Sequence, residues 1–124
     1  MRGSEKQRRT ILHFGTEREV FTWRARGLHQ KGYHVLNVNN GFEAIKLAAD
    51  KQVDAVLLDL DRNSAEVALV AAEIKRCRPQ VPTILLTEGT AAVTLCELAD
   101  ALVPKRDNLE MLVTTLESVL AFSE

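Results

Sequence analysis

Three residues that suit phosphoryl chemistry, Asp59, Thr87 and Lys105, each stand directly after a short apolar run or within one residue of it. A carboxylate is a nucleophile that can form an acyl phosphate. An ammonium and a hydroxyl can hold phosphoryl oxygens by charge and by hydrogen bonds. A surface salt bridge between Asp59 and Lys105, with Thr87 as a strand-end cap, fits the same spacing equally well. Spacing alone leaves these two interpretations open.

The elements that would position these residues alternate between short apolar runs and longer helical patterns. Strands are predicted at 10–14, 33–38, 55–58, 83–86 and 101–103. Helices are predicted at 17–31, 42–51, 64–76, 91–98 and 108–122. This alternation predicts a parallel sheet covered by helices on both faces. In such sheets the working site lies beyond the carboxyl ends of the strands, where the three polar residues would meet.

The helix at 17–31 has the poorest pattern of the five. Gly27 interrupts it, and its predicted core anchors are Val20, Trp23 and Leu28. His13, inside the first strand, is predicted to be a packed or strand-edge residue rather than a phosphate carrier.

Bulk composition bounds the class of protein. The length of 124 residues and the apolar fraction of 46% suit one domain over 1–124, with 1–9 as a flexible lead-in. A net charge of −1 gives no support to nucleic-acid or membrane partners. Cys77 and Cys96 match no metal-binding spacing, so we expect reduced, partly buried thiols and a cytoplasmic location.

Several segments together resemble the receiver domain of response regulators over about residues 10–121. The segments that carry the resemblance are Val-Asp-Ala-Val-Leu-Leu-Asp-Leu at 53–60, Gly-Tyr-His-Val at 32–35, Asn-Gly-Phe-Glu-Ala at 40–44, Val-Pro-Thr-Ile-Leu-Leu-Thr at 81–87 and Ala-Asp-Ala-Leu-Val-Pro-Lys at 99–105. The resemblance implies a flavodoxin-like (βα)5 fold, doubly wound, with strand order 2-1-3-4-5. It also implies that Asp59 is the phosphoacceptor, Thr87 the switch hydroxyl and Lys105 the lysine of the fifth strand.

The sequence departs from the family where the metal should bind. Receivers carry two acidic residues after the first strand, and this chain has Gly15 and Thr16 there. Hard cations need several oxygen ligands, so Mg²⁺ is expected to bind weakly or not at all, at a site of Asp59 and Asp61. Asp59 is the only carboxylate at a matching position, and Asp61, Glu17 or Glu88 could compensate in part. Asp61 is favoured as a solvated loop residue. No cofactor is then required, and Lys105 is expected to be the main counter-charge to Asp59.

These features favour an atypical receiver that acts as a protein-interaction module in a two-component phosphorelay, and not an enzyme. The expected partner is a histidine kinase or another signalling protein, and a homodimer is left open. The alternative is a fully competent receiver that takes phosphate from a histidine kinase onto Asp59 in a Mg²⁺-dependent reaction. A flavodoxin-like small-molecule binder is disfavoured, because the sequence contains no nucleotide or flavin loop.

Overall fold

The computed structural model describes residues 8–15, 18–49, 52–59, 64–87, 97–104 and 109–123. Its elements, in chain order, are β1 (Thr10–Phe14), α2 (Arg18–Gln30), β2 (His34–Val38), α3 (Gly41–Ala49), β3 (Ala55–Asp59), α4 (Ser64–Cys77), β4 (Thr83–Thr87), β5 (Ala101–Pro104) and α6 (Leu109–Ser123). Glu97 and Leu98 are helical, and the rest of the helix predicted at 91–98 lies outside the described residues.

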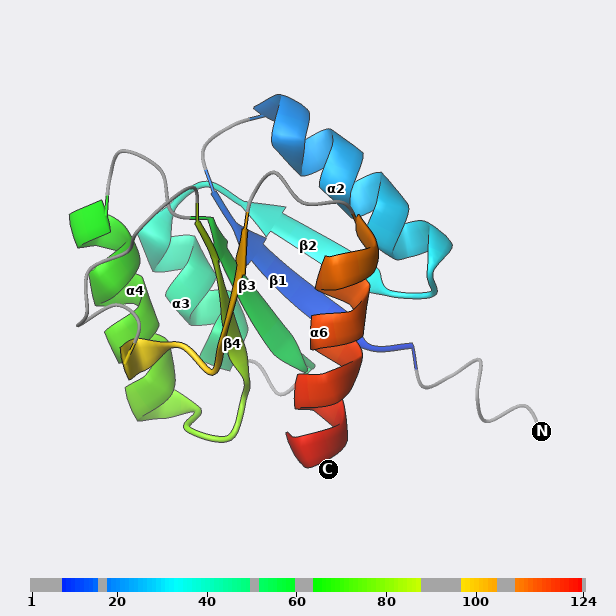
Figure 1. The fold of residues 1–124 in the computed structure, drawn as a ribbon. Coiled ribbons are helices and arrows are strands. Elements are labelled where there is room, and N and C mark those ends of the chain that lie inside the picture. The colour runs from blue at the N-terminus through cyan, green and yellow to red at the C-terminus, as the bar shows by residue number, and fades with distance from the viewer. Residues whose placement is uncertain are drawn as a thin grey trace.

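The five strands form one parallel sheet in the order β2-β1-β3-β4-β5, which confirms the predicted topology. Figure 1 shows α2 and α6 on one side of this sheet and α3 and α4 on the other. All four pairings run in the same direction, so the carboxyl ends of the strands share one edge. The candidate site residues Asp59 and Thr87 end β3 and β4 at that edge.

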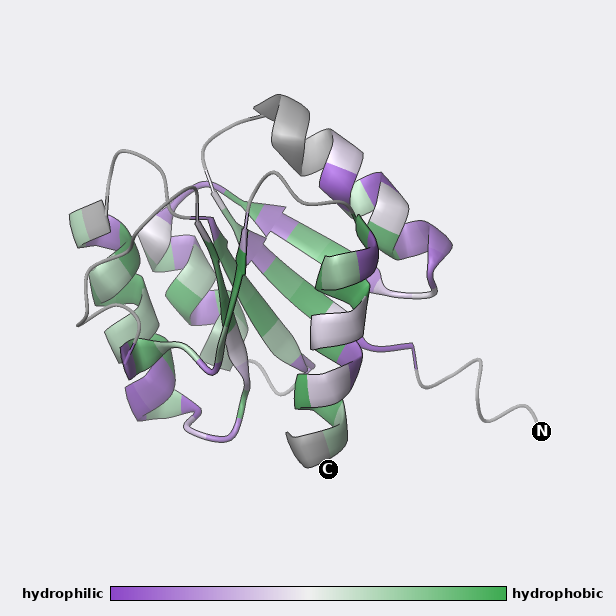
Figure 2. Cartoon of the chain, viewed as in Figure 1, coloured by the Kyte–Doolittle hydropathy of each residue, from purple (hydrophilic) through white to green (hydrophobic). Residues whose placement is uncertain are grey.

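The hydrophobic core has two halves, one on each face of the sheet. Every residue of β3 and β4 is buried, as expected for central strands that helices cover on both faces. One half contains Leu12, Phe14 and Leu58 beneath α3 and α4. The other contains Ile11 and Leu57 beneath α2 and α6. Figure 2 shows the apolar strands in the centre and more polar colours on the outer surfaces of the helices. Within the described residues, no helix is long and apolar enough to cross a membrane.

Helix α2 presents a different face to the core from the one predicted. Trp23 was expected to anchor the helix, but 57% of it is exposed, so that prediction is wrong. Among the side chains of α2 that the structure describes, the buried ones are Arg24, 3% exposed, and Leu28, four positions later on the same helix face. Leu28 is thus confirmed as an anchor, while the side chain of Val20 lies outside the described part. Cys77 was expected to be partly buried and is exposed instead.

A glycine in the left-handed region ends α2 and turns the chain into β2. Gly32 has φ of 98°, and its N–H donates to the His29 carbonyl. The next N–H, of Tyr33, donates to the Leu28 carbonyl, which completes a Schellman motif. This turn sets where α2 ends and β2 begins.

Candidate functional site

Asp59 lies at the carboxyl edge of the sheet but inside the protein. It is 2% exposed and lies two positions after Leu57, on the same face of β3, which packs into the core beneath α2 and α6. Its register partner on β4 is Leu86, and Thr87 is the next residue. Thr87 is 9% exposed and stands opposite Pro104 of β5. The structure therefore brings Asp59 and Thr87 to neighbouring strand ends, while Lys105 and Asp61 lie outside the described residues.

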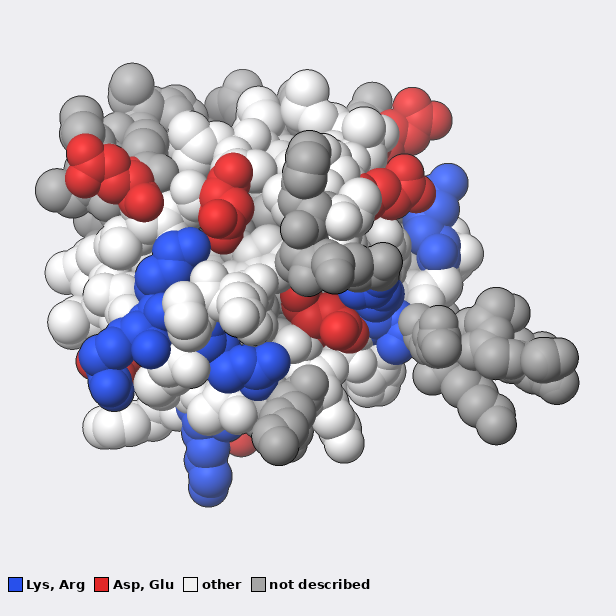
Figure 3. All heavy atoms as spheres, turned by 90° about the horizontal axis from the view of Figure 1, so that it is seen from below, with Lys and Arg blue, Asp and Glu red and all other residues white. Residues whose placement is uncertain are grey.

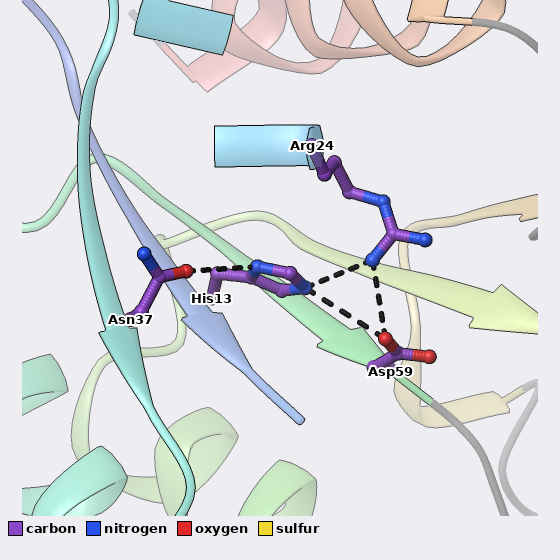
Figure 4. A network of polar contacts seen from close by, with 4 residues as sticks. All are labelled: His13, Arg24, Asn37 and Asp59. Atoms are coloured by element: carbon purple, nitrogen blue, oxygen red, sulfur yellow. Dashed lines mark hydrogen bonds and ion pairs between the residues drawn. The ribbon is translucent and has the colours of Figure 1, made fainter. Parts of the chain in front are cut away.

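The Asp59 carboxylate forms an ion pair with a helix residue that the sequence analysis did not single out. Nη1 of Arg24 donates a hydrogen bond of 3.1 Å to Oδ2 of Asp59. Both side chains are almost fully buried. Figure 4 shows the guanidinium reaching down from α2 to the end of β3. The positive charge nearest to Asp59 among the described residues thus comes from the core face of α2.

His13 lies beside Asp59 and gives Arg24 a second buried partner. Nε2 of His13 is 3.0 Å from Arg24 Nη1, and Nδ1 is 3.1 Å from Oδ1 of Asn37 (Figure 4). His13 and Asn37 are register partners on β1 and β2, which is why the two side chains meet. Because a guanidinium only donates, Nε2 must accept, and Nδ1–H then donates to the amide oxygen. His13 is fully buried, which confirms the predicted packed role.

Burial also decides the charge state of His13. Loss of solvation lowers the pKa of the imidazole below its ordinary value of 6.5, although the nearby Asp59 carboxylate acts in the opposite direction. Nε2 is 3.8 Å from Oδ2 of Asp59, farther than its distance of 3.0 Å from Arg24. We therefore assign a neutral imidazole, so the contact between His13 and Asp59 is a polar contact rather than an ion pair. The three residues together carry one positive and one negative charge.

The buried pair differs from the ion pairs on the surface. Lys75 contacts Asp100 at 3.4 Å, and Arg76 contacts Glu73 at 2.8 Å, all on exposed or partly exposed side chains. Figure 3 shows charged side chains of both signs on the surface of the molecule seen from below. Pairs of this kind contribute little, because water screens them. A buried pair is different, because losing one partner leaves the other charge desolvated and uncompensated.

The described residues do not fit the divalent-metal site that the resemblance implies. Gly15 directly follows β1 and offers no side-chain ligand, and its N–H donates to the Val38 carbonyl. Oδ2 of Asp59 already accepts a hydrogen bond from a cation. Among the residues that the structure describes, no three His, Cys, Asp or Glu side chains cluster in a way that could hold a metal ion. Thr16 and Asp61 lie outside that part of the chain.

Sequence reasoning missed Arg24 and Asn37 and saw His13 only as a packed residue. One signal for Arg24 was available, because it precedes Leu28 by four positions and so shares the face of a predicted core anchor. Trp23, one position earlier, is larger and more apolar, so its face of the helix was predicted to be buried in place of the face of Arg24. No comparable signal marks Asn37, since its contact depends on the register between β1 and β2.

Comparison with known proteins supports the fold through structure alone. No protein-family model and no curated protein matches the chain. A CheY-like receiver domain from Methanospirillum hungatei matches 94% of this chain and 97% of its own, with a TM-score of 0.84 and 18% identity. The receiver domain of a sensor histidine kinase from Pseudomonas aeruginosa, with magnesium in its active-site cleft, matches 92% of this chain and 98% of its own. Its TM-score is 0.82 and its sequence identity is 22%.

A third similar structure is the response regulator TrrA from Thermotoga maritima, solved with Mg²⁺ and BeF. It is 25% identical over 90% of this chain and 98% of its own, with a TM-score of 0.80. TrrA is also known in complex with the histidine kinase ThkA. The chain therefore has the fold of the CheY-like receiver domains of two-component signalling. The chain places a buried arginine, Arg24, against Asp59, the residue predicted to occupy the phosphoacceptor position.

Proposed function

We propose that this chain is an atypical receiver domain that acts as a protein-interaction module in a two-component or related pathway, without phosphoryl transfer to Asp59. The observation that carries the proposal is the buried ion pair between Arg24 and Asp59, at 3.1 Å. A carboxylate attacks phosphorus with a free oxygen lone pair and an open approach. Here one oxygen is engaged by the guanidinium, and the side chain is 1% exposed.

Charge supports the same conclusion. A phosphoryl group brings about two negative charges to the carboxylate, and catalysis depends on cations that offset them. The acidic pair that would bind such a cation is replaced at its first position by Gly15, directly after β1. The proposed domain therefore requires no metal or other cofactor, and any Mg²⁺ site involving Asp59 and Asp61 is weak.

The proposed partner is a signalling protein of the cytoplasm, either a histidine kinase or another component of the pathway. The support is the receiver fold together with the complex that TrrA forms with ThkA. In this proposal the chain is not an enzyme. It binds through a surface whose shape does not depend on phosphorylation.

Labelling with a small phosphodonor tests the proposal. The unaltered protein is incubated with acetyl phosphate or phosphoramidate, with and without Mg²⁺, and its intact mass is measured. TrrA serves as the positive control. We expect a phosphoryl adduct on TrrA and none on this protein. A Mg²⁺-dependent adduct that disappears in Asp59→Asn would overturn the proposal.

The competent receiver remains the alternative, and one observation favours it. Arginine is a frequent phosphate ligand, and Arg24 is already within reach of Asp59. After a movement of the guanidinium, the same charge would hold phosphoryl oxygens, with Thr87 at the neighbouring strand end. The mass measurement separates the two functions directly, because only the alternative yields the adduct on Asp59.

A further inference from the structure

The arrangement around Asp59 supplies a cation from within the chain. The guanidinium of Arg24 donates to Oδ2 of Asp59 and lies 3.0 Å from Nε2 of His13, so two buried acceptors fix its position. His13 is in turn held by Asn37 of the edge strand. The guanidinium therefore arrives at the carboxylate from a fixed direction, as a bound metal ion would.

We infer that Arg24 is the built-in cation of this site and takes the functional place of a divalent metal at Asp59, with His13 as its positioning residue. The inference goes beyond the proposed function, because it concerns what neutralises Asp59 and would stand even if Asp59 accepted phosphate. It makes the charge state of the site independent of Mg²⁺ concentration.

The charges at this site disfavour a bound divalent metal ion. Asp59 and Arg24 together are neutral, so the buried pair offers no net negative charge to a divalent ion. A divalent ion at the carboxylate would also lie within a few ångströms of the guanidinium, where like charges repel strongly in a poorly solvated site. Restoring acidic residues after β1 should therefore not be enough to restore a metal site. Arg24 must be removed as well.

Two variants of the full chain test this directly. The first is Gly15→Asp with Thr16→Asp, and the second adds Arg24→Met, which keeps most of the side-chain volume. Mg²⁺ binding is measured by isothermal titration calorimetry. We expect the second variant, with all three changes, to bind Mg²⁺ at least about tenfold more tightly than the first variant, because one positive unit charge has been removed from the site. Equal affinities, or tight binding while Arg24 is present, would overturn the inference.

A conservative variant separates charge from packing. Arg24→Lys in the Gly15→Asp, Thr16→Asp background keeps the positive charge but loses the planar fork. If the charge excludes the metal, this protein should bind Mg²⁺ as weakly as the variant that keeps arginine. Binding as tight as in the Arg24→Met protein would show that side-chain shape was responsible, against the inference.

A second measurement covers the case in which the acidic variants fail to fold. Thermal unfolding is compared for Arg24→Met, Asp59→Asn and the two combined. If Arg24 neutralises Asp59, each single change removes the charge that the other residue faces, so the combined variant should lose less stability than the sum of the two single losses. The control is the exposed pair, with Arg76→Met and Glu73→Gln, for which changes should simply add. Additive losses at Arg24 and Asp59 would refute the role of Arg24.

Discussion

Arg24 and Asp59 are 35 positions apart in the sequence, and their side chains form a hydrogen-bonded ion pair of 3.1 Å inside the protein. The pair joins the first described helix to the central strand at the edge where receivers carry their working site. It gives the buried carboxylate a positively charged partner within the described part of the chain, where no three His, Cys, Asp or Glu side chains could together hold a metal ion.

Removal of Arg24 should be far more costly than removal of an arginine elsewhere on the same helix. Arg24→Met leaves the Asp59 carboxylate buried without this partner, and we expect a loss of about 3–5 kcal/mol in the free energy of unfolding. Arg26→Met is the matched control, because Arg26 is exposed on α2. Urea denaturation followed by circular dichroism measures both. Similar small losses for the two variants would contradict the buried ion pair.

Stability should fall as the solution becomes acidic, because His13 is buried in its neutral form. Its folded pKa lies below the unfolded value near 6.5, so the unfolded chain binds more protons below that pH. The contribution of His13 is thus fully present at neutral pH and is lost as the pH falls from about 6.5 toward the folded pKa. The slope approaches about 1.4 kcal/mol per pH unit.

The measurement for His13 compares urea midpoints between pH 7.5 and pH 5 for the unaltered protein and His13→Gln. Glutamine keeps an amide that can accept from Arg24 and donate to Asn37, but it does not titrate in this range. We expect a flatter profile for the variant. Identical slopes would mean that other groups cause the acid sensitivity.

Trp23 should behave as a surface residue. It is 57% exposed, so Trp23→Ala is expected to change the free energy of unfolding by no more than about 0.5 kcal/mol. A buried tryptophan would cost about 3–5 kcal/mol. Because it is the only tryptophan in the chain, its fluorescence should also be readily quenched by acrylamide in the folded protein. Protection from acrylamide would mean that α2 turns a different face, the one with Trp23, toward the sheet.

The turn between α2 and β2 should depend on glycine through backbone conformation alone. A Cβ at Gly32 would meet nothing within 4 Å, yet φ is +98°. Gly32→Ala should therefore cost about 1–2 kcal/mol, and Gly32→Asn less, since asparagine adopts the left-handed region more readily. Thermal unfolding of both variants tests this order. Equal stability of alanine and glycine would show that the turn adopts another conformation.

The sheet was predictable because its signals are local. The runs at 55–58 and 83–86 are continuously apolar, and this pattern is typical of strands that are covered on both faces. Alternation with helices then favours parallel pairing, which brings Asp59 and Thr87 to one edge before any contact is known. Strand order also needed the family resemblance, because the apolar runs alone do not say which strand lies at the edge.

The partners of Asp59 could not be predicted in the same way. A charged residue in a helix is ordinarily assigned to the solvent face. Burial of Arg24 is favourable only because its guanidinium pairs with Asp59, and that pairing cannot be read from the sequence. The contact between His13 and Asn37 needs the register of two strands that are far apart in sequence. Lys105 was predicted as the main counter-charge and lies outside the described residues, so that prediction stays open; the counter-charge that the structure describes is Arg24, from a helix.

A buried pair of opposite charges also restricts how such a sequence can change over time. If either Arg24 or Asp59 is replaced alone, the other buried charge loses this ion pair, so the intermediate with a single replacement is the less stable one. Replacement of both, by contrast, can return a stable core. Descendants of this chain should therefore retain or lose the two residues together, and an inward-facing arginine eleven positions after a buried histidine on the first strand would mark those that retain the arrangement.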